Sequence, residues 1–92
     1  MSRSVATVTP ISNTTSSGTI VPLNNSRRGL QIFNDSTARL YLKYGSSASL
    51  SDYSLYLNAG EFWEMAEPIY SGIITGLWNA ADASGKARVT EM

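Results

Sequence analysis

Residues 27–45 read RRGLQIFNDSTARLYLKYG, and this stretch decides the fold. Over residues 38–44, leucine and tyrosine alternate with mostly charged side chains, and this period of two predicts a half-buried β-strand. A shorter β-prone run over residues 29–34 predicts a second strand. Between the two runs, Asn-Asp-Ser-Thr at 34–37 supplies side chains that bond their own backbone, so we expect a hairpin or a tight corner there.

Turn residues divide the chain from residue 19 onward into further short β-prone runs. Additional strands are predicted over residues 19–23, 53–57, 61–65, 72–79 and 87–91. No segment keeps an apolar period of 3.6 residues over three turns, so we expect little helix, at most one turn near Ala80 to Ala83. About seven short strands at regular spacing favour an all-β fold. The class expected is an antiparallel β-sandwich, Ig-like or jelly-roll-like, with a small barrel as the alternative.

Strand alternation also assigns several side chains to faces. Tyr53 is expected on the core face of its strand and Tyr56 on the opposite face. Trp78 is expected in the core, and Gly76 is expected to let a bulky neighbour such as Trp63 or Trp78 lie across the backbone. Pro22 argues for an edge position of the first strand, because proline cannot donate to a β-ladder.

The N-terminal residues 1–18 differ in composition from the rest of the chain. They are mostly Ser, Thr, Asn and Gly with a few aliphatic residues, a composition that cannot bury enough apolar area to order itself alone. We therefore expect a flexible arm over residues 1–18 and one β-sandwich domain over residues 19–92. Val5, Ala6 and Val8 could form a short strand once they meet a surface.

Composition excludes several classes of function. The chain has no histidine and no cysteine, which removes disulfides, Ser-His and Cys-His nucleophile pairs, and the usual zinc, haem and iron-sulfur ligands. Seven Lys and Arg balance seven Asp and Glu, so no global field attracts nucleic acid or an anionic membrane. No apolar run approaches a membrane span, and the first residues lack a signal-peptide core, so we expect a chain made in a cytoplasm.

The carboxylates and glycines do not form a catalytic pattern. Glu61, Glu64 and Glu67 are the only carboxylate cluster in the sequence. An odd spacing along a strand turns Glu61 and Glu64 to opposite faces, so they cannot flank a glycosidic bond as a pair. The glycines match neither a P-loop nor a dinucleotide fingerprint. We expect no enzyme activity, no cofactor and no metal site.

The adjacent Arg27 and Arg28 enter a predicted strand. One is expected to point outward and the other to lie along the sheet edge, where a guanidinium can bind a carboxylate or a carbonyl of another chain. An ion pair within the domain, to Glu91 or Asp35, is the alternative. Both arginines are therefore candidates for a protein interface.

Four aromatic residues are candidates for the outer face of the sheets. These are Phe33, Tyr41, Tyr56 and Trp63. Alternation places three of them there, and the strand register of Trp63 is not determined by the sequence. Exposed aromatics on a sheet can stack on bases or sugars, and they also form protein interfaces. Only Arg39 and Lys43 are interleaved with them and the net charge is zero, so the protein interface is favoured. A carbohydrate-binding module that uses Tyr41, Tyr56 or Trp63 as stacking platforms is the alternative of another class.

Three longer stretches resemble a small β-sandwich module found in structural proteins of tailed bacteriophages. They are NSRRGLQIFNDSTARLYLKYGSSAS, YSLYLNAGEFWEM and SGIITGLWNAADASGKARVTEM, and together they span most of residues 26–92. The shared pattern includes an Asn-Asp corner, a Leu-x-Ala-Gly turn before an aromatic pair, and a closing Ala-Arg-Val-Thr-Glu. The matching positions are Arg28 to Leu30, Asn34, Asp35, Leu57 to Gly60, Gly72, Gly76, Trp78 and Arg88 to Glu91.

The resemblance implies a virion component assembled in the host bacterial cytoplasm. Such a component would be a capsid decoration or cement protein that binds the outer capsid lattice and stabilises the head, or else a neck, tail or head-fibre anchoring module. The expected partners are the major capsid protein or other virion proteins, and further copies of the chain, with a trimer favoured. No specific nucleic acid and no membrane partner is expected. Residues 1–18 fall outside the shared pattern.

Overall fold

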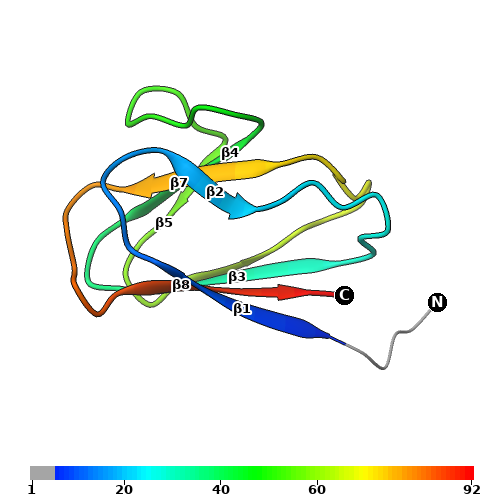
Figure 1. Ribbon diagram of the computed structural model, residues 1–92, viewed down its shortest axis with the longest axis horizontal. Helices are drawn as coiled ribbons and strands as arrows, with labels where there is room; N and C mark the ends of the chain where they lie inside the picture. Colours follow the sequence, from blue (N-terminus) through cyan, green and yellow to red (C-terminus); the bar gives the residue numbers. More distant parts are fainter. Residues whose placement is uncertain (1–5) are drawn as a thin grey trace.

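The computed structural model describes residues 6–92 and shows a β-sandwich (Figure 1). Its strands are β1 (Thr7–Ser12), β2 (Gly18–Val21), β3 (Leu30–Asp35), β4 (Leu40–Tyr44), β5 (Leu55–Leu57), β6 (Phe62–Glu64), β7 (Ile74–Trp78) and β8 (Lys86–Glu91). Strands β1, β8, β3 and β6 form sheet A in that order, and β2, β7, β4 and β5 form sheet B. The antiparallel β-sandwich expected from the sequence is confirmed.

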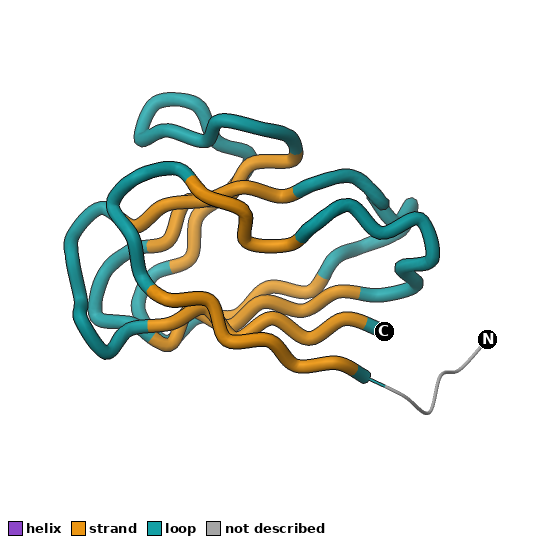
Figure 2. Tube along the Cα trace, viewed as in Figure 1, coloured by secondary structure: helices purple, strands orange, loops and turns teal. Residues whose placement is uncertain are grey.

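The described residues consist of strands and loops only (Figure 2). No helix in this part of the chain could therefore cross a membrane. The helical turn considered near Ala80 does not form, and residues 79–85 make bends and turns instead. Asn13 explains the difference, because its Nδ2 donates to the carbonyl oxygen of Ala80 (3.2 Å) and its Oδ1 accepts from the backbone N–H of Asp82 (3.2 Å).

Strand pairing gives the topology of a jelly roll. β1 pairs with β8, β2 with β7, β3 with β6 and β4 with β5, all antiparallel. The chain is therefore one long antiparallel ribbon, folded over so that β8 also pairs with β3 and β7 with β4. Two four-stranded sheets of this kind are the double Greek key of jelly rolls rather than the sheet pattern of an immunoglobulin domain.

The corner at residues 34–37 carries the chain from sheet A to sheet B. β3 and β4 belong to different sheets, so the segment is a tight corner and not a hairpin. Asn34 holds it from inside the core, where its Nδ2 donates to the carbonyl oxygens of Ala38 (2.8 Å) and Leu57 (2.9 Å). The Nε1 of Trp78 donates to Asn34 Oδ1 (3.0 Å), so the whole amide is satisfied.

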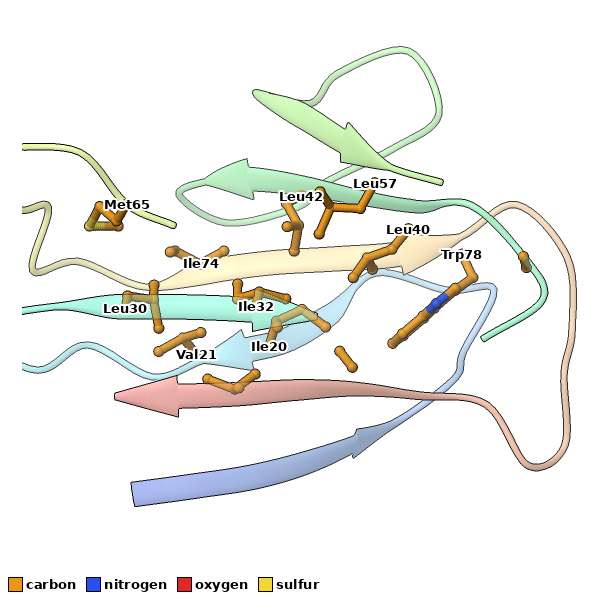
Figure 3. Close-up of a cluster of buried hydrophobic side chains, with 13 residues drawn as sticks. Ile20, Val21, Leu30, Ile32, Leu40, Leu42, Leu57, Met65, Ile74 and Trp78 are labelled. Carbon is orange, nitrogen blue, oxygen red and sulfur yellow. The ribbon is translucent and has the colours of Figure 1, made fainter. Parts of the chain in front are cut away.

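The core lies between the two sheets, and the larger side chains of both sheets meet there (Figure 3). Trp78 is buried as expected, at 1% exposure. β7 is buried along its whole length. A Cβ on Gly76 would lie 2.6 Å from the carbonyl oxygen of Tyr41 and 2.9 Å from Cγ1 of Ile20. The close neighbours of Gly76 are therefore a backbone and an aliphatic side chain, not the indole that the sequence suggested.

The N-terminal segment differs from the expected arm over residues 1–18. Thr7–Ser12 form β1, the edge strand of sheet A, which pairs with β8 along its whole length. Most β1 side chains are exposed and only Ile11 packs partly against the core, so the hydrophobic pattern gave no strand signal. Of the three residues expected to form a short strand, Val8 lies in β1, Ala6 lies just before it, and Val5 lies outside the described residues.

Candidate functional site

Three tyrosines gather on the outer face of sheet B. Tyr41 of β4 and Tyr56 of β5 are cross-strand partners, and Tyr53 joins them from the loop that precedes β5. The ring centroids of Tyr41 and Tyr53 are 4.8 Å apart, those of Tyr41 and Tyr56 5.8 Å, and those of Tyr53 and Tyr56 6.2 Å. Tyr53 and Tyr56 are 40% and 44% exposed, so both rings are open to a ligand or partner.

Arg39 and Asn58 extend this cluster on its polar side. The guanidinium carbon of Arg39 lies 4.5 Å from the centroid of the Tyr56 ring, a cation–π contact. Its Nε donates to Asn58 Oδ1 (2.8 Å), and its Nη1 donates to the Tyr41 hydroxyl (3.4 Å), a hydrogen bond that raises the pKa of Arg39. The five residues Arg39, Tyr41, Tyr53, Tyr56 and Asn58 are called the tyrosine surface below.

The loop over residues 45–54 is pinned beside the tyrosine surface (Figure 1, green). The hydroxyl of Thr75 donates to the carbonyl oxygen of Gly45 (2.7 Å) and accepts from the backbone N–H of Ala48 (3.2 Å). Lys43 Nζ lies 2.6 Å from Asp52 Oδ2. These contacts tie the loop to β7 and β4, so Tyr53 is held in place before any partner binds.

Arg27 is buried inside the domain, whereas Arg28 is exposed. The Nε of Arg27 pairs with Glu91 Oε2 (2.8 Å), the intradomain ion pair that the sequence left open as an alternative. Its Nη1 donates to the carbonyl oxygen of Tyr70 (2.6 Å) and its Nη2 to that of Pro22 (2.8 Å). The guanidinium of Arg27 therefore joins chain segments within the domain and is not available to a partner.

Phe33 and Trp63 lie away from the tyrosine surface. Phe33 is on the outer face of sheet A and is 37% exposed. Trp63 pairs with Ile32, a fully buried residue, so its side chain faces inward and is half-buried. It contacts Tyr44 edge to face at 5.9 Å, and Tyr44 stacks on Tyr70 at 4.9 Å. Burial in this group raises the pKa of Tyr44. Trp63 therefore closes one end of the core.

The structure thus brings together Tyr41 and Tyr56 with the interleaved Arg39, and it adds two residues that the sequence did not place there, Tyr53 and Asn58. The prediction that Tyr53 lies on the core face is wrong, because it extends the alternation over residues 53–57, whereas β5 begins only at Leu55 and Tyr53 is exposed. The Ser and Asp residues before Tyr53 form a bridged turn, with Ser49 and Asp52 exchanging backbone hydrogen bonds of 2.9 and 3.2 Å. That turn composition is the signal that could have removed Tyr53 from the strand.

A polar hollow of about 310 Å³ opens at the corner end of the sandwich. Its central carboxylate, Asp82, accepts hydrogen bonds from the backbone N–H (3.0 Å) and hydroxyl (3.1 Å) of Thr37 and from the hydroxyl of Ser36 (3.3 Å). The backbone hydrogen bond from Thr37 is the main reason that the pKa of Asp82 is lowered. The Asp82 carboxylate therefore connects its own loop to the corner at residues 34–37 by hydrogen bonds. Residues 6–92 contain no group of three or more acidic, His or Cys side chains placed to hold a metal.

No family model matches the chain, and neither the curated proteins nor the solved structures contain a significant match to it. The class that the fold and the site define is a jelly-roll β-sandwich with an organised tyrosine surface on one sheet.

Proposed function

We propose that this protein is a non-enzymatic structural protein of a tailed-bacteriophage virion. In this proposal it is a capsid decoration or cement protein that binds the outer capsid lattice through the tyrosine surface. The supports are the resemblance of residues 26–92 to the phage β-sandwich module and a jelly-roll fold, which viral capsid domains use. A fold by itself does not define a function, so the tyrosine surface is the main observation on which the proposal rests.

The tyrosine surface has the composition of a binding hot spot. Tyrosine and arginine are enriched among the residues that dominate the energy of protein interfaces. Tyrosine rings bury a large area while losing little side-chain entropy. Here the rings already contact one another and Arg39 fixes Tyr56, so little further ordering is required on binding. The guanidinium of Arg39 adds specificity, because a partner must offer it a carboxylate or a carbonyl group.

Cementing follows from mass action. A copy that contacts two neighbouring capsid subunits stabilises the assembled lattice relative to separated subunits, in proportion to its binding free energy. Several bound copies together raise the barrier to lattice opening under the pressure of packaged DNA. The protein needs no reaction chemistry for this role, only a rigid body and a partner surface.

The deciding experiment is quantitative mass spectrometry of purified particles, which counts this chain relative to the major capsid protein. A copy number comparable to that of the capsid protein is expected for decoration. A few copies per particle would point instead to the neck, tail or head-fibre anchoring role. Absence from the particles would refute the virion proposal.

A binding assay tests the surface itself. Purified protein is added to particles that lack it, and Tyr56→Ala is expected to weaken binding at least about tenfold, as loss of a hot-spot side chain does. Leu23→Ala truncates an exposed side chain in the loop after β2, outside the tyrosine surface, and as the matched control it should leave binding unchanged. Equal binding by Tyr56→Ala and the wild type would exclude the tyrosine surface.

A second candidate function is carbohydrate binding at the same place. It is favoured by the exposed rings of Tyr53 and Tyr56 beside the amide of Asn58, since a sugar ring can pack on an aromatic face while its hydroxyls bond to polar neighbours. The inward-facing Trp63 is not part of this candidate. A glycan screen with wild type and Tyr56→Ala separates the two ideas, because only a glycan site gives a signal that the variant abolishes.

A further inference from the structure

The outer face of sheet A, on the other side of the sandwich, carries a row of exposed side chains that includes two adjacent phenylalanines. The strand registers place Pro10, Arg88, Phe33 and Phe62 side by side across all four strands. Phe62 is 61% exposed and Phe33 is 37% exposed, and Val8 in the next row is 61% exposed. Two adjacent phenylalanines on the open face of a sheet are unusual in a monomer and are typical of an interface.

The charges beside this row are divided between two neighbouring strands. β8 carries Lys86 and Arg88 on the outer face, and β3 carries Phe33 and Asp35. Arg88 Nε donates to Asp35 Oδ2 at 3.1 Å, with both side chains about half exposed. Lys86, directly opposite Asp35 in the register, has no ion-pair partner within the described chain. The face therefore presents a basic column next to a column that is aromatic and acidic.

We propose that this face binds a second copy of the chain in a two-fold dimer. This proposal goes beyond the proposed function and gives a specific form to the homo-oligomer expected in the sequence analysis. A two-fold axis parallel to the strands, between β8 and β3, lays β8 of one copy over β3 of the other. Arg88 then lies over Phe33 of the second copy, and Lys86 lies over its Asp35. Pro10 of the edge strand likewise lies over Phe62 of the second copy.

Each of these contacts occurs twice, which is the requirement for an isologous interface. A three-fold ring needs two different patches that fit each other, whereas this single face is complementary to itself. The two-fold arrangement therefore differs from the trimer favoured by the sequence. It also leaves the tyrosine surface on sheet B free, so one sheet contacts a second copy and the other contacts the particle.

The size of the face sets the strength of the expected dimer. Four strands spaced about 4.8 Å apart and about five residues long give a flat area of about 300 Å² per copy. Two copies would cover about 600 Å² together, less than the roughly 1,200–2,000 Å² of stable specific interfaces, so the dimer should be weak and its formation should depend strongly on protein concentration. Two such sheets would pack about 10 Å apart with their side chains interdigitated.

Sedimentation velocity of the purified full-length protein over a concentration series provides the first test. The wild type is expected to pass from monomer to dimer as concentration rises. Phe62→Ser is expected to stay monomeric over the same range, and its circular dichroism spectrum should match that of the wild type because the side chain is mostly exposed. A monomer at every concentration, a trimer, or a dimer that survives Phe62→Ser would each overturn the proposal.

A mixing experiment tests the two-fold charge pairing. Lys86→Glu alone places two carboxylates against each other at both symmetry-related contacts, and Asp35→Lys alone places two ammonium groups there. Each variant by itself should therefore fail to dimerise, while an equimolar mixture should form a heterodimer in which both contacts are attractive. A contact within one copy cannot produce this rescue. Failure of the mixture to associate would refute the charge pairing.

The control for the mixing experiment is Glu67→Lys, a charge change in an exposed loop outside the face, which should dimerise like the wild type. These measurements need only the pure protein. Failure of the dimer would therefore leave the virion proposal standing, and absence of the chain from particles would leave the dimer standing.

Discussion

Trp78 Nε1 and Asn34 Oδ1 form a 3.0 Å hydrogen bond inside the core, between the last residue of β7 and the corner that leaves β3. The bond joins the two sheets of the sandwich at the place where the chain crosses between them. Neither residue could be buried alone at low cost, since an indole N–H and a primary amide both require partners in an apolar interior. The corner and the core therefore depend on each other.

Replacing Asn34 by leucine should destabilise the protein strongly. The change leaves the carbonyl oxygens of Ala38 and Leu57 and the Trp78 indole N–H without partners, at a cost of about 3 kcal/mol or more in unfolding free energy. The loss of unfolding free energy can be measured by urea denaturation, with tryptophan fluorescence as the signal. Asn25→Leu, at an exposed asparagine, should change stability by less than about 0.5 kcal/mol. Similar losses in the two variants would argue against the buried network.

Arg27→Met should also destabilise the fold, because it removes the partner of Glu91 and of three loop carbonyl oxygens. Loss of one member of a buried ion pair costs about 3 to 5 kcal/mol, and the lower end applies since Glu91 is partly exposed. Arg28→Met, the exposed neighbour, is the matched control for the same urea experiment. If both variants unfold at the same urea concentration, Arg27 does not hold the chain segments together.

Asp82 should make stability depend on pH in the acidic range. Its pKa is lowered in the folded state, chiefly by the backbone N–H of Thr37, so the unfolded chain binds a proton more readily. The stabilisation is present above the unfolded pKa of about 4 and is lost as the pH falls through the folded pKa. Thermal melts at several pH values should show a smaller acid-induced drop for Asp82→Asn than for the wild type. An identical drop in both proteins would show that the hydrogen bonds of Asp82 do not cause the loss of stability in acid.

Gly76→Ala tests the packing between β7 and its neighbours. The added Cβ meets the carbonyl oxygen of Tyr41 at 2.6 Å, and a backbone atom in the middle of a sheet cannot move aside. Overpacking of this kind should lower the unfolding free energy by about 2 kcal/mol or more. Gly18→Ala is the control, because nothing lies within 4 Å of a Cβ built there. Equal melting temperatures for the two variants would contradict the close contact.

The sequence predicts the elements whose signal is local. β3 and β4 alternate, and β7 lies in the most apolar of the predicted strands, so their positions and the sandwich class follow from period and composition. The orientation of Trp63 is not predicted by such local signals. This residue lies in a three-residue strand between turns, and only its pairing with Ile32 turns it toward the core.

Long-range contacts decide the remaining differences. Arg27 is buried because carbonyl oxygens from residues 22 and 70 converge on it, a meeting that no local pattern encodes. β1 is held by its ladder with β8 rather than by apolar side chains, so its composition predicted an arm. The tyrosine surface was half predicted, since alternation exposes Tyr41 and Tyr56 but the folded loop alone brings Tyr53 to them.

Thr75 is not part of the tyrosine surface, but it should determine how well Tyr53 is ordered before a partner binds. Its hydroxyl holds both Gly45 and the N–H of Ala48, so Thr75→Val frees the loop while keeping the shape of the buried side chain. Hydrogen exchange at Ala48 should become faster, and particle binding should weaken because Tyr53 must then be ordered on binding. Thr19→Val, at an exposed position on β2, should alter neither measurement. Faster exchange with unchanged binding would show that the loop and Tyr53 do not contribute to the partner contact.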